Sequence, residues 1–397
     1  METSLSGLRG MHTSFEIADA SGVAFARRGA NDAAQKGALN DTDTGRVALI
    51  LTEAATNILK HAQHGELLVR ALPADAAGAL TDGVEIIAVD KGPGMQDVRH
   101  AFHDGRSTAG SPGTGLGAIN RLSDELCMYS QPRLGTVLRA VVRSRSANAR
   151  AATGAGRPAL GTDIGGISVP YPGESVCGDA WSVDADQHGL TITVADGLGH
   201  GPDAHVAAAS AIDVVHRRAG RSPATLMQMA HDALRPTRGA AVAIARLDLA
   251  RAQLAFAGTG NVAASIFNVG RPASISGGAW PGMNALGHGS NTSASGERNS
   301  WQLTSRNGIV GHTMRDSQEF EVPWTRNALL ILHSDGIGTR WDLAAYPGLH
   351  LQPAVMIAAV LYRDFSRRRD DATVVVVKAD QQSTCMGLEQ VLCMGKE

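Results

Sequence analysis

Two groups of residues in the sequence could carry phosphate or metal chemistry, and the first lies upstream. Glu53 and Asn57 stand four residues apart in a stretch with helical periodicity, so both side chains project from one helix face. Asp90 ends a short apolar run, and Gly92 and Gly94 follow it in a turn. A carboxylate, a carboxamide and a glycine-rich turn in this order can converge on one polar ligand, because glycine lets backbone approach closely.

A second glycine-rich stretch opens the next predicted helix and comprises Gly113, Thr114, Gly115, Leu116 and Gly117. Backbone N–H groups at a helix N-terminus favour phosphate. Each piece alone has an ordinary explanation, since polar i,i+4 pairs are frequent on solvated helix faces and a lone G-x-G-x-G is usually a turn. Their order and spacing together favour a nucleotide site.

The second group consists of aspartates at the ends of apolar runs or in turns beside glycine. They are Asp179, Asp196 with Gly197 after it, Asp335, Asp370 and Asp371. Carboxylates gathered at strand ends make a hard-oxygen site suited to Mg2+ or Mn2+. A single Asp-Gly is a turn in most proteins, but four such places beside predicted strands indicate a metal site.

Hydrophobic periodicity predicts the elements that position these residues. Upstream we predict strands at 14–18, 66–72, 84–89, 127–130 and 136–142, and helices at 22–39, 44–61 and 116–126. Downstream we predict strands at 190–195, 240–247, 253–257, 263–267, 328–333 and 373–378, and helices at 204–218, 222–234 and 353–365. The class is α+β, with helices on one face of a mixed sheet upstream and sheets packed against helix pairs downstream.

Composition divides the chain and limits its partners. Small, polar and Gly/Pro residues at 144–161 indicate a linker between domains at 1–143 and 162–380, followed by a tail at 381–397. The formal charge of -2 shows no excess of basic residues that would indicate binding to nucleic acid or an anionic membrane. The sequence contains no run of about 18 apolar residues, so we predict no transmembrane helix. The four cysteines lack zinc-site spacing, so we expect reduced thiols in a cytoplasmic protein.

The runs TEAATNILKHA, DKGPGM and GTGLGAINRLSDEL resemble the GHKL ATPases, specifically their anti-sigma-factor serine kinase branch of the RsbT and RsbW type. The resemblance covers about residues 14–142 and implies a Bergerat-type ATP fold. It implies that Asn57 ligands Mg2+, that Glu53 is the general base for the incoming hydroxyl, and that Asp90 binds the adenine amino group. The glycines implied to shape the adenine turn or wrap the triphosphate are Gly92, Gly94, Gly113, Gly115 and Gly117.

The runs ESVCGDAW, ITVADGLGHGPDA, LLILHSDGI and RRRDDATVVVVK resemble the PPM phosphatases in their SpoIIE and RsbX branch. The resemblance implies an αββα sandwich with two metals between the sheets. Asp196, with the carbonyl of the glycine after it, would bridge the metals, while Asp335 and Asp370 would hold one of them. Asp179 would complete the shell directly or through water. Asp371 is adjacent to Asp370, and which of the two is the ligand stays open, with Asp370 favoured.

Together the two resemblances imply a bifunctional protein that uses ATP and Mg2+ or Mn2+. It would phosphorylate and dephosphorylate a STAS-domain regulator in a partner-switching pathway, with a sigma factor or anti-sigma component as a further partner. Two alternatives stay open: a phosphatase with a nucleotide-binding regulatory domain, and a non-catalytic module that sequesters its partner. A histidine-kinase relative is disfavoured because no upstream helix carries a phospho-acceptor histidine.

Overall fold

The structure is a computed structural model. It describes residues 9–73, 82–98, 115–145, 162–268, 283–285, 300–314, 316–379 and 393–395. The chain forms two compact units. The N-terminal unit comprises the described parts of His12–Arg157, Leu351–Arg363 and Cys385–Glu397, and the C-terminal unit those of Met1–Met11, Pro158–His350 and Asp364–Thr384. The domain boundaries inferred from composition stay predictions.

The N-terminal unit is built on a six-stranded sheet in the order β1-β2-β3-β5-β4-β17. The strands are β1 (Thr13–Ile17), β2 (Gly65–Leu72), β3 (Gly83–Asp90), β4 (Glu125–Gln131), β5 (Gly135–Arg143) and β17 (Cys393–Gly395). Every pair of neighbours is antiparallel, so the expectation of a mixed sheet was wrong. Periodicity locates strands but does not give their direction, which the connections between them decide.

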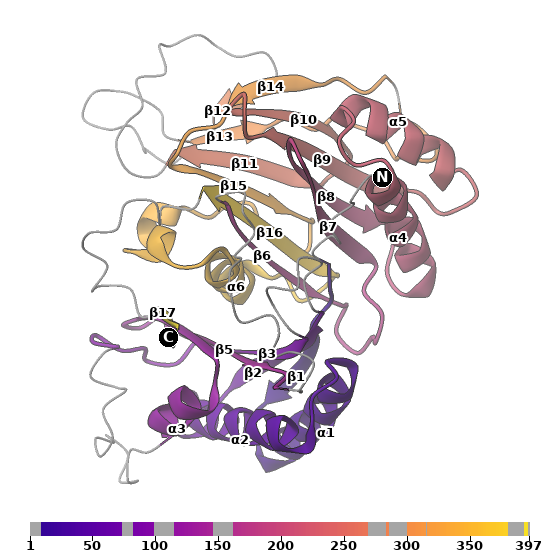
Figure 1. The fold of residues 1–397 in the computed structure, drawn as a ribbon. Helices are drawn as coiled ribbons and strands as arrows, with labels where there is room; N and C mark the ends of the chain where they lie inside the picture. The colour runs from indigo at the N-terminus through magenta and orange to yellow at the C-terminus, as the bar shows by residue number, and fades with distance from the viewer. Residues whose placement is uncertain are drawn as a thin grey trace, which may run out of the picture. The chain divides into compact units, whose positions relative to one another are not determined.

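Three helices, α1 (Ala20–Lys36), α2 (Asp41–Asn57) and α3 (Gly115–Leu122), cover one face of this sheet (Figure 1). Asp19 caps α1 by accepting hydrogen bonds from two backbone N–H groups, and Asn40 caps α2 by accepting one from Asp43. Alanines on α1 and aliphatic residues on α2 pack against the alternate, inward-facing residues of β2, β3 and β5. The α+β class and this two-layer arrangement confirm the prediction.

Helix α3 ends at Leu122, four residues before the predicted end. The Ser123 hydroxyl donates to the Ile119 carbonyl, and the Asp124 N–H donates to Val141 on β5. The Asp124 carboxylate accepts hydrogen bonds from Arg46 and from the Arg143 backbone N–H. These contacts draw the chain out of the helix and into β4 at Glu125, which apolar periodicity alone does not reveal.

The other face of the sheet carries a buried ionic network centred on Glu85 of β3. Its fully buried carboxylate accepts hydrogen bonds from Arg70 at 2.7 Å and Arg139 at 2.5 Å, and lies 3.2 Å from His12. Burial alone would raise the pKa of Glu85, but the two guanidinium groups hold it well below its usual range. The network satisfies charges that could not otherwise be buried.

Helix α6 (Ala354–Phe365) is also part of the N-terminal unit over most of its length. Its residues from Ala354 to Arg363 are all buried, which is typical of a helix that is apolar on every side. Tyr362 and Arg363 are the polar residues of this buried stretch, and the Tyr362 hydroxyl donates to the buried Glu66 carboxylate of β2 at 2.9 Å. This bond fixes the helix against the strand.

The C-terminal unit contains two antiparallel sheets. The first has the order β14-β10-β9-β8-β7, with β7 (Asp179–Asp186), β8 (Gly189–Gly197), β9 (Ala240–Asp248), β10 (Gln253–Thr259) and β14 (Phe320–Pro323). The second has the order β12-β13-β11-β15-β16-β6, with β6 (Thr162–Val169), β11 (Ala263–Asn268), β12 (Met283–Ala285), β13 (Ser300–Leu303), β15 (Ala328–His333) and β16 (Ala372–Ala379).

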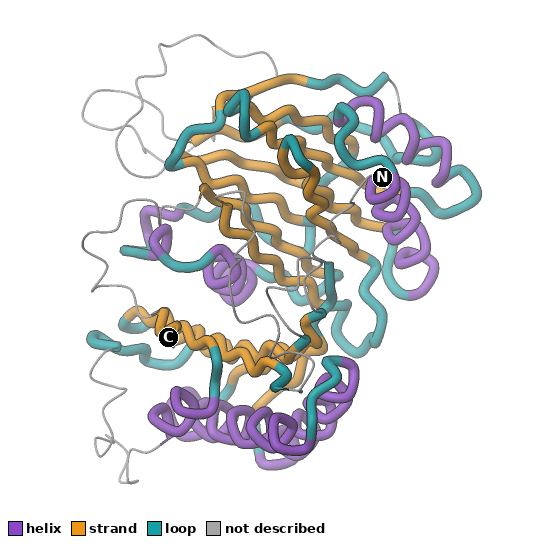
Figure 2. Tube along the Cα trace, in the orientation of Figure 1, coloured by secondary structure: helices purple, strands orange, loops and turns teal. Residues whose placement is uncertain are grey.

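The two sheets share one apolar core, to which Trp181 and Phe256 contribute from the first sheet and Leu330 and Val375 from the second. Helices α4 (Pro202–Arg217) and α5 (Pro223–Leu234) pack on the outer face of the first sheet over a second core. Figures 1 and 2 show this succession of helices, sheet and sheet within the unit. The six strands and two helices predicted here are confirmed.

Several elements escaped the sequence analysis, including β6, β7, β12, β13, β14 and β17. Glycines and aspartates interrupt the apolar pattern of β6 and β7, which weakens a strand signal. The expectation of reduced thiols is wrong for Cys127, which is disulfide-bonded; Cys393 lies opposite it in the β4–β17 register. Within the described ranges, no helix is both long and apolar enough to cross a bilayer.

We expect Glu85→Ala to destabilise the N-terminal unit by about 3–5 kcal/mol, because it removes the buried carboxylate that Arg70 and Arg139 share. Urea unfolding read by hydrogen exchange of β3 and β5 amides measures the loss. Asp232→Ala breaks the exposed Arg235–Asp232 pair and serves as the control, with an expected change of less than about 1 kcal/mol. Equal effects of the two variants would contradict a structural role for the network.

Candidate functional site

The first candidate site forms where α2 meets the start of α3. Glu53 and Asn57 occupy the last turns of α2, and Gly115 is the first residue of α3. A Cβ added to Gly115 would lie 2.9 Å from Glu53 Oε2 and 3.4 Å from Asn57 Oδ1. The structure therefore brings together these three residues, which are separated by some sixty positions in the sequence, and glycine leaves the space between them open.

Asp90 lies at the end of β3, and its carboxylate is held by neutral donors. The Gly92 N–H donates to Asp90 Oδ1 at 2.8 Å, and Thr136 lies opposite Asp90 in the β3–β5 register. Burial raises the pKa of Asp90, while the N–H groups of Gly92 and Thr136 act in the opposite direction. Thr136 was not singled out from the sequence, and only its place in the register shows that it neighbours Asp90.

The turn after Asp90 requires glycine for steric reasons. Gly94 has a φ of +64°, and a Cβ there would lie 2.0 Å from the Gln131 carbonyl oxygen. A Cβ on Gly92 would lie 2.7 Å from Ala62, the last residue of the π-helical turn Ile58–Ala62 that continues α2. Single π turns inside helices are frequent at functional sites. Backbone from β3 and α2 thus approaches closely beside Asp90.

The remaining predicted nucleotide residues have different outcomes. Gly113 and Thr114 lie outside the described residues. Leu116 packs against the apolar core of the unit, and Gly117 is buried in α3. A nucleotide-binding role for these residues stays a prediction.

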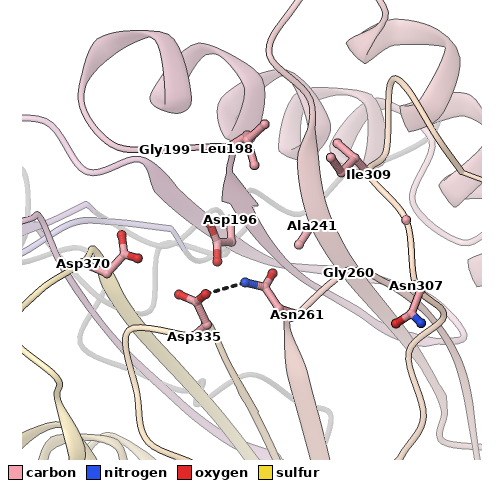
Figure 3. Close-up of a pocket in the computed structure, with 11 residues that line it drawn as sticks. Asp196, Leu198, Gly199, Ala241, Gly260, Asn261, Asn307, Ile309, Asp335 and Asp370 are labelled. Carbon is pink, nitrogen blue, oxygen red and sulfur yellow. Dashed lines mark hydrogen bonds between the residues drawn. The ribbon is translucent and has the colours of Figure 1, made fainter.

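The second candidate site is a cavity of about 470 Å³ in the C-terminal unit. Asp196 at the end of β8, Asp335 just after β15 and Asp370 just before β16 line it (Figure 3). Asp179 at the start of β7 lies opposite Asp196 in the strand register and is buried. Four of the predicted metal ligands therefore gather where strands of both sheets end.

The carboxylates shift one another's protonation. Burial, followed by the charges of Asp179 and Asp335, raises the pKa of Asp196 to about 9. Burial also raises the pKa of Asp179 to about 8, although the Ser334 hydroxyl, which donates to it at 2.6 Å, acts against the shift. Burial and the charge of Asp335 raise the pKa of Asp370. Such shifts show anionic groups crowded together without a compensating cation.

The neighbours Asp370 and Asp371 are placed differently. Asp370 lines the cavity, whereas Asp371 is buried and accepts a hydrogen bond from the Tyr171 N–H at Oδ1. Asp371 Oδ2 is buried with no hydrogen-bond partner, and a Cβ on Gly178 would lie 2.6 Å from it. Gly197 is required where it stands, because a Cβ there would lie 2.0 Å from the Ala204 carbonyl.

This donor set fits a hard divalent cation. Among the described residues, no three acidic, histidine or cysteine side chains already converge to the spacing of a metal shell. Asp196, Asp335 and Asp370 nevertheless line one cavity, and the buried Asp179 and Asp371 adjoin Asp196 and Asp370 in the register and in the sequence, so the donors are all oxygens. Oxygen-only donors are the preference of Mg2+ and Mn2+.

The cavity also has lining residues that were not predicted from the sequence. Asn261 and Asn307 contribute carboxamides, and Leu198 and Ile309 contribute apolar surface (Figure 3). Leu198 is 51% exposed. The sequence offered one signal for Asn261, its position in the turn Gly258-Thr259-Gly260-Asn261 directly after a strand.

Known proteins are similar to two regions of the chain. Residues 17–142 match the model of the histidine kinase-like ATPase domain. The serine/threonine-protein kinase RsbT of Bacillus subtilis (strain 168) is 34% identical over 119 residues, which are 30% of this chain and 86% of RsbT. Through this N-terminal region the chain belongs to the RsbT family.

A second relative matches with a different activity. The phosphoserine phosphatase RsbX of Bacillus subtilis (strain 168) is 32% identical over 90 residues, which are 23% of this chain and 45% of RsbX. The chain thus spans less than half of that relative, and it combines similarity to a kinase with similarity to a phosphatase.

Solved structures were also compared with the chain. One from work on the bacterial stressosome is 25% identical, with a TM-score of 0.45, and covers 55% of this chain and 99% of that one. RsbX in complex with magnesium is 22% identical, with a TM-score of 0.43, and covers 54% of this chain and 94% of that one.

We expect Gly115→Val to weaken MgATP binding at least about tenfold, a cost of about 1.4 kcal/mol, because its side chain would fill the space between Glu53 and Asn57. Displacement of a fluorescent ATP analogue measures the affinity. Gly45→Val is the matched control, since a Cβ at Gly45 of α2 meets nothing within 4 Å. Unchanged affinity in Gly115→Val would place the nucleotide elsewhere.

We expect the metal-free chain to lose stability between pH 6 and pH 8. The folded state retains protons on Asp179 and Asp196, whose pKa values are about 8 and 9, whereas the unfolded chain releases them near pH 4. A native state that binds more protons is destabilised as pH rises. Thermal melting in EDTA measures the loss of stability. Asp196→Asn removes one of the two carboxyl groups and leaves every histidine in place, so the difference between the variant and wild type is due to the carboxyl group. An equal pH dependence of wild type and Asp196→Asn would contradict the assignment.

Proposed function

We propose that the chain is a bifunctional switch protein. Its N-terminal unit is an ATP-dependent serine/threonine kinase, and its C-terminal unit is a metal-dependent phosphoserine/phosphothreonine phosphatase. The observation that carries the proposal is the presence of two groups of side chains on one chain: Glu53 and Asn57 facing Gly115, and the carboxylates that line the cavity.

In the kinase unit, Glu53 is the general base that accepts the proton of the incoming hydroxyl. Asn57, one helical turn further on, would hold the Mg2+ that accompanies ATP, and Asp90 would accept a hydrogen bond from the adenine amino group. Phosphoryl transfer depends on positioning and charge neutralisation more than on covalent chemistry. A regulatory nucleotide-binding domain has no need of a base, so the carboxylate of Glu53 beside Asn57 favours a kinase over that alternative.

In the phosphatase unit, the residues that would hold divalent ions are Asp196, Asp335 and Asp370. Asp179 lies opposite Asp196 on the neighbouring strand. Bound divalent ions supply Lewis acidity toward phosphoryl oxygens and acidify water. The protein's own part is to keep the carboxylates in place at rigid strand ends and to line the substrate side with the apolar Leu198 and Ile309.

The proposed substrate of both units is one STAS-domain regulator in a partner-switching pathway, with a sigma factor or anti-sigma component as a further partner. The similarity of one chain to both a serine/threonine kinase and a phosphoserine phosphatase supports a shared target. Two sites on one chain also raise the effective concentration of the second site for a substrate held at the first.

The test is phosphoprotein mass spectrometry of a STAS-domain protein incubated with ATP, Mn2+ and the full chain. We expect phosphate to accumulate with Asp196→Ala, to be absent with Glu53→Ala, and to be removed from preloaded substrate by wild type. Glu53→Ala should lower the kinase activity by at least about 100-fold, the usual lower range for loss of a general base. Asp196→Ala should lower the phosphatase activity because it removes a proposed metal ligand.

Three other outcomes would each contradict part of the proposal. Removal of preloaded phosphate without any addition would reduce the N-terminal unit to a nucleotide-binding regulator. Addition without removal would leave a kinase alone. A stable complex with the STAS-domain protein that is unaffected by Glu53→Ala and accompanied by no transfer would indicate a sequestering module.

A further inference from the structure

One side chain of the cavity bonds directly to a predicted metal ligand although it is not itself acidic. The Asn261 Nδ2 atom donates to Asp335 Oδ2 at 2.5 Å (Figure 3). A carboxylate can only accept, so the amide nitrogen and not the amide oxygen must face Asp335. The orientation of the carboxamide is therefore fixed by chemistry, and hydrogen bonds to a charged acceptor are the strong ones.

The strand register places these two residues opposite each other. Strands β11 and β15 are antiparallel, with Ala263 opposite His333. Continuing that ladder by two residues beyond each strand brings Asn261 opposite Asp335. Asn261 also lies where the chain leaves β10 of the first sheet and enters β11 of the second, so its position is set by both sheets.

The backbone just before Asn261 is fixed by close packing and by hydrogen bonds. Gly260 has a φ of +95°, and a Cβ there would lie 2.4 Å from the Ala241 Cβ. The Gly260 N–H donates to the Arg306 carbonyl at 2.8 Å, and the Arg306 N–H donates to the Gly258 carbonyl at 2.9 Å. The side chain is exposed, but it projects from a fixed backbone.

Asp335 needs such a neutral donor because its other close neighbours are acidic. The charge of Asp335 contributes to the raised pKa values of both Asp196 and Asp370. No lysine or arginine is among the described residues that line the cavity. A cationic donor would neutralise Asp335 and compete with a metal ion, whereas an amide holds one oxygen and leaves the negative charge in place.

We propose that Asn261 is a positioning residue for Asp335. Its amide holds Oδ2 and thereby orients the carboxylate for a divalent cation in the cavity before the cation binds. This inference rests on the proposed phosphatase function, because it assumes that Asp335 is a metal ligand. Residues that hydrogen-bond to metal ligands orient those ligands. Their removal typically weakens metal affinity 10–100-fold.

The experiment is a calorimetric titration of the metal-free full chain with Mn2+ alone. Asn261→Ala should bind Mn2+ about 10–100-fold more weakly than wild type, and Asn261→Ser, which keeps one shorter donor, should also bind more weakly. Asn31→Ala is the control, because Asn31 is an exposed carboxamide on α1 that lines no part of the cavity. Its affinity for Mn2+ should be that of wild type.

Two further readouts separate positioning from a general loss of structure. The melting temperature in EDTA should be nearly unchanged in Asn261→Ala, since substitutions of exposed residues usually change stability little. With p-nitrophenyl phosphate as the probe, saturating Mn2+ should restore most of the kcat of Asn261→Ala, whereas it should not restore that of Asp335→Ala.

The possible failures are distinguishable. Wild-type affinity for Mn2+ in both Asn261 variants, or an equal loss in Asn31→Ala, would overturn the positioning role and leave the phosphatase proposal standing. A wild-type chain that binds no Mn2+ and hydrolyses no phosphoserine would overturn both.

Discussion

Carboxylates held side by side at rigid strand ends repel one another, and the C-terminal unit is organised around that repulsion. Three of these carboxylates accept hydrogen bonds from uncharged donors in the described structure. The Ser334 hydroxyl donates to Asp179, the Tyr171 N–H to Asp371 and the Asn261 amide to Asp335. Uncharged donors satisfy hydrogen bonds without cancelling negative charge, so the cavity keeps the electrostatic potential that attracts a divalent cation.

The N-terminal unit uses the opposite solution where a carboxylate has only a structural task. Glu85 is fully buried and is neutralised by Arg70 and Arg139, which hold its pKa well below the usual range. Asp90, by contrast, is held by backbone N–H groups, and its pKa is raised. The donors thus differ between Glu85, which completes the fold, and Asp90, which remains available to a ligand. Glu66, held by the Tyr362 hydroxyl, shows that a structural carboxylate can also have an uncharged donor.

The sequence predicted the parts of each site that depend on local chemistry. A glycine after a strand-end aspartate, or at the start of a helix, leaves a recognisable local pattern, and the structure shows the steric reason at Gly94, Gly115 and Gly197. Helices and strands with clear apolar periodicity were also predicted well. Strands β6 and β7 were missed because their glycines and polar residues interrupt that periodicity, and the end of α3 was missed because contacts of Asp124 with distant residues determine it.

Pairs of residues that are distant in the sequence were beyond prediction for a different reason. Asn261 and Asp335 are separated by 74 positions, and Tyr362 and Glu66 by 296. No local pattern marks such partners, because strand order and register alone decide which turn lies opposite which. Once the antiparallel pairing of β11 with β15 is known, the Asn261–Asp335 contact follows by counting residues along the ladder. Sequence motifs therefore identify the charged groups of this cavity, whereas the topology of the two sheets supplies the neutral partner that holds one of them.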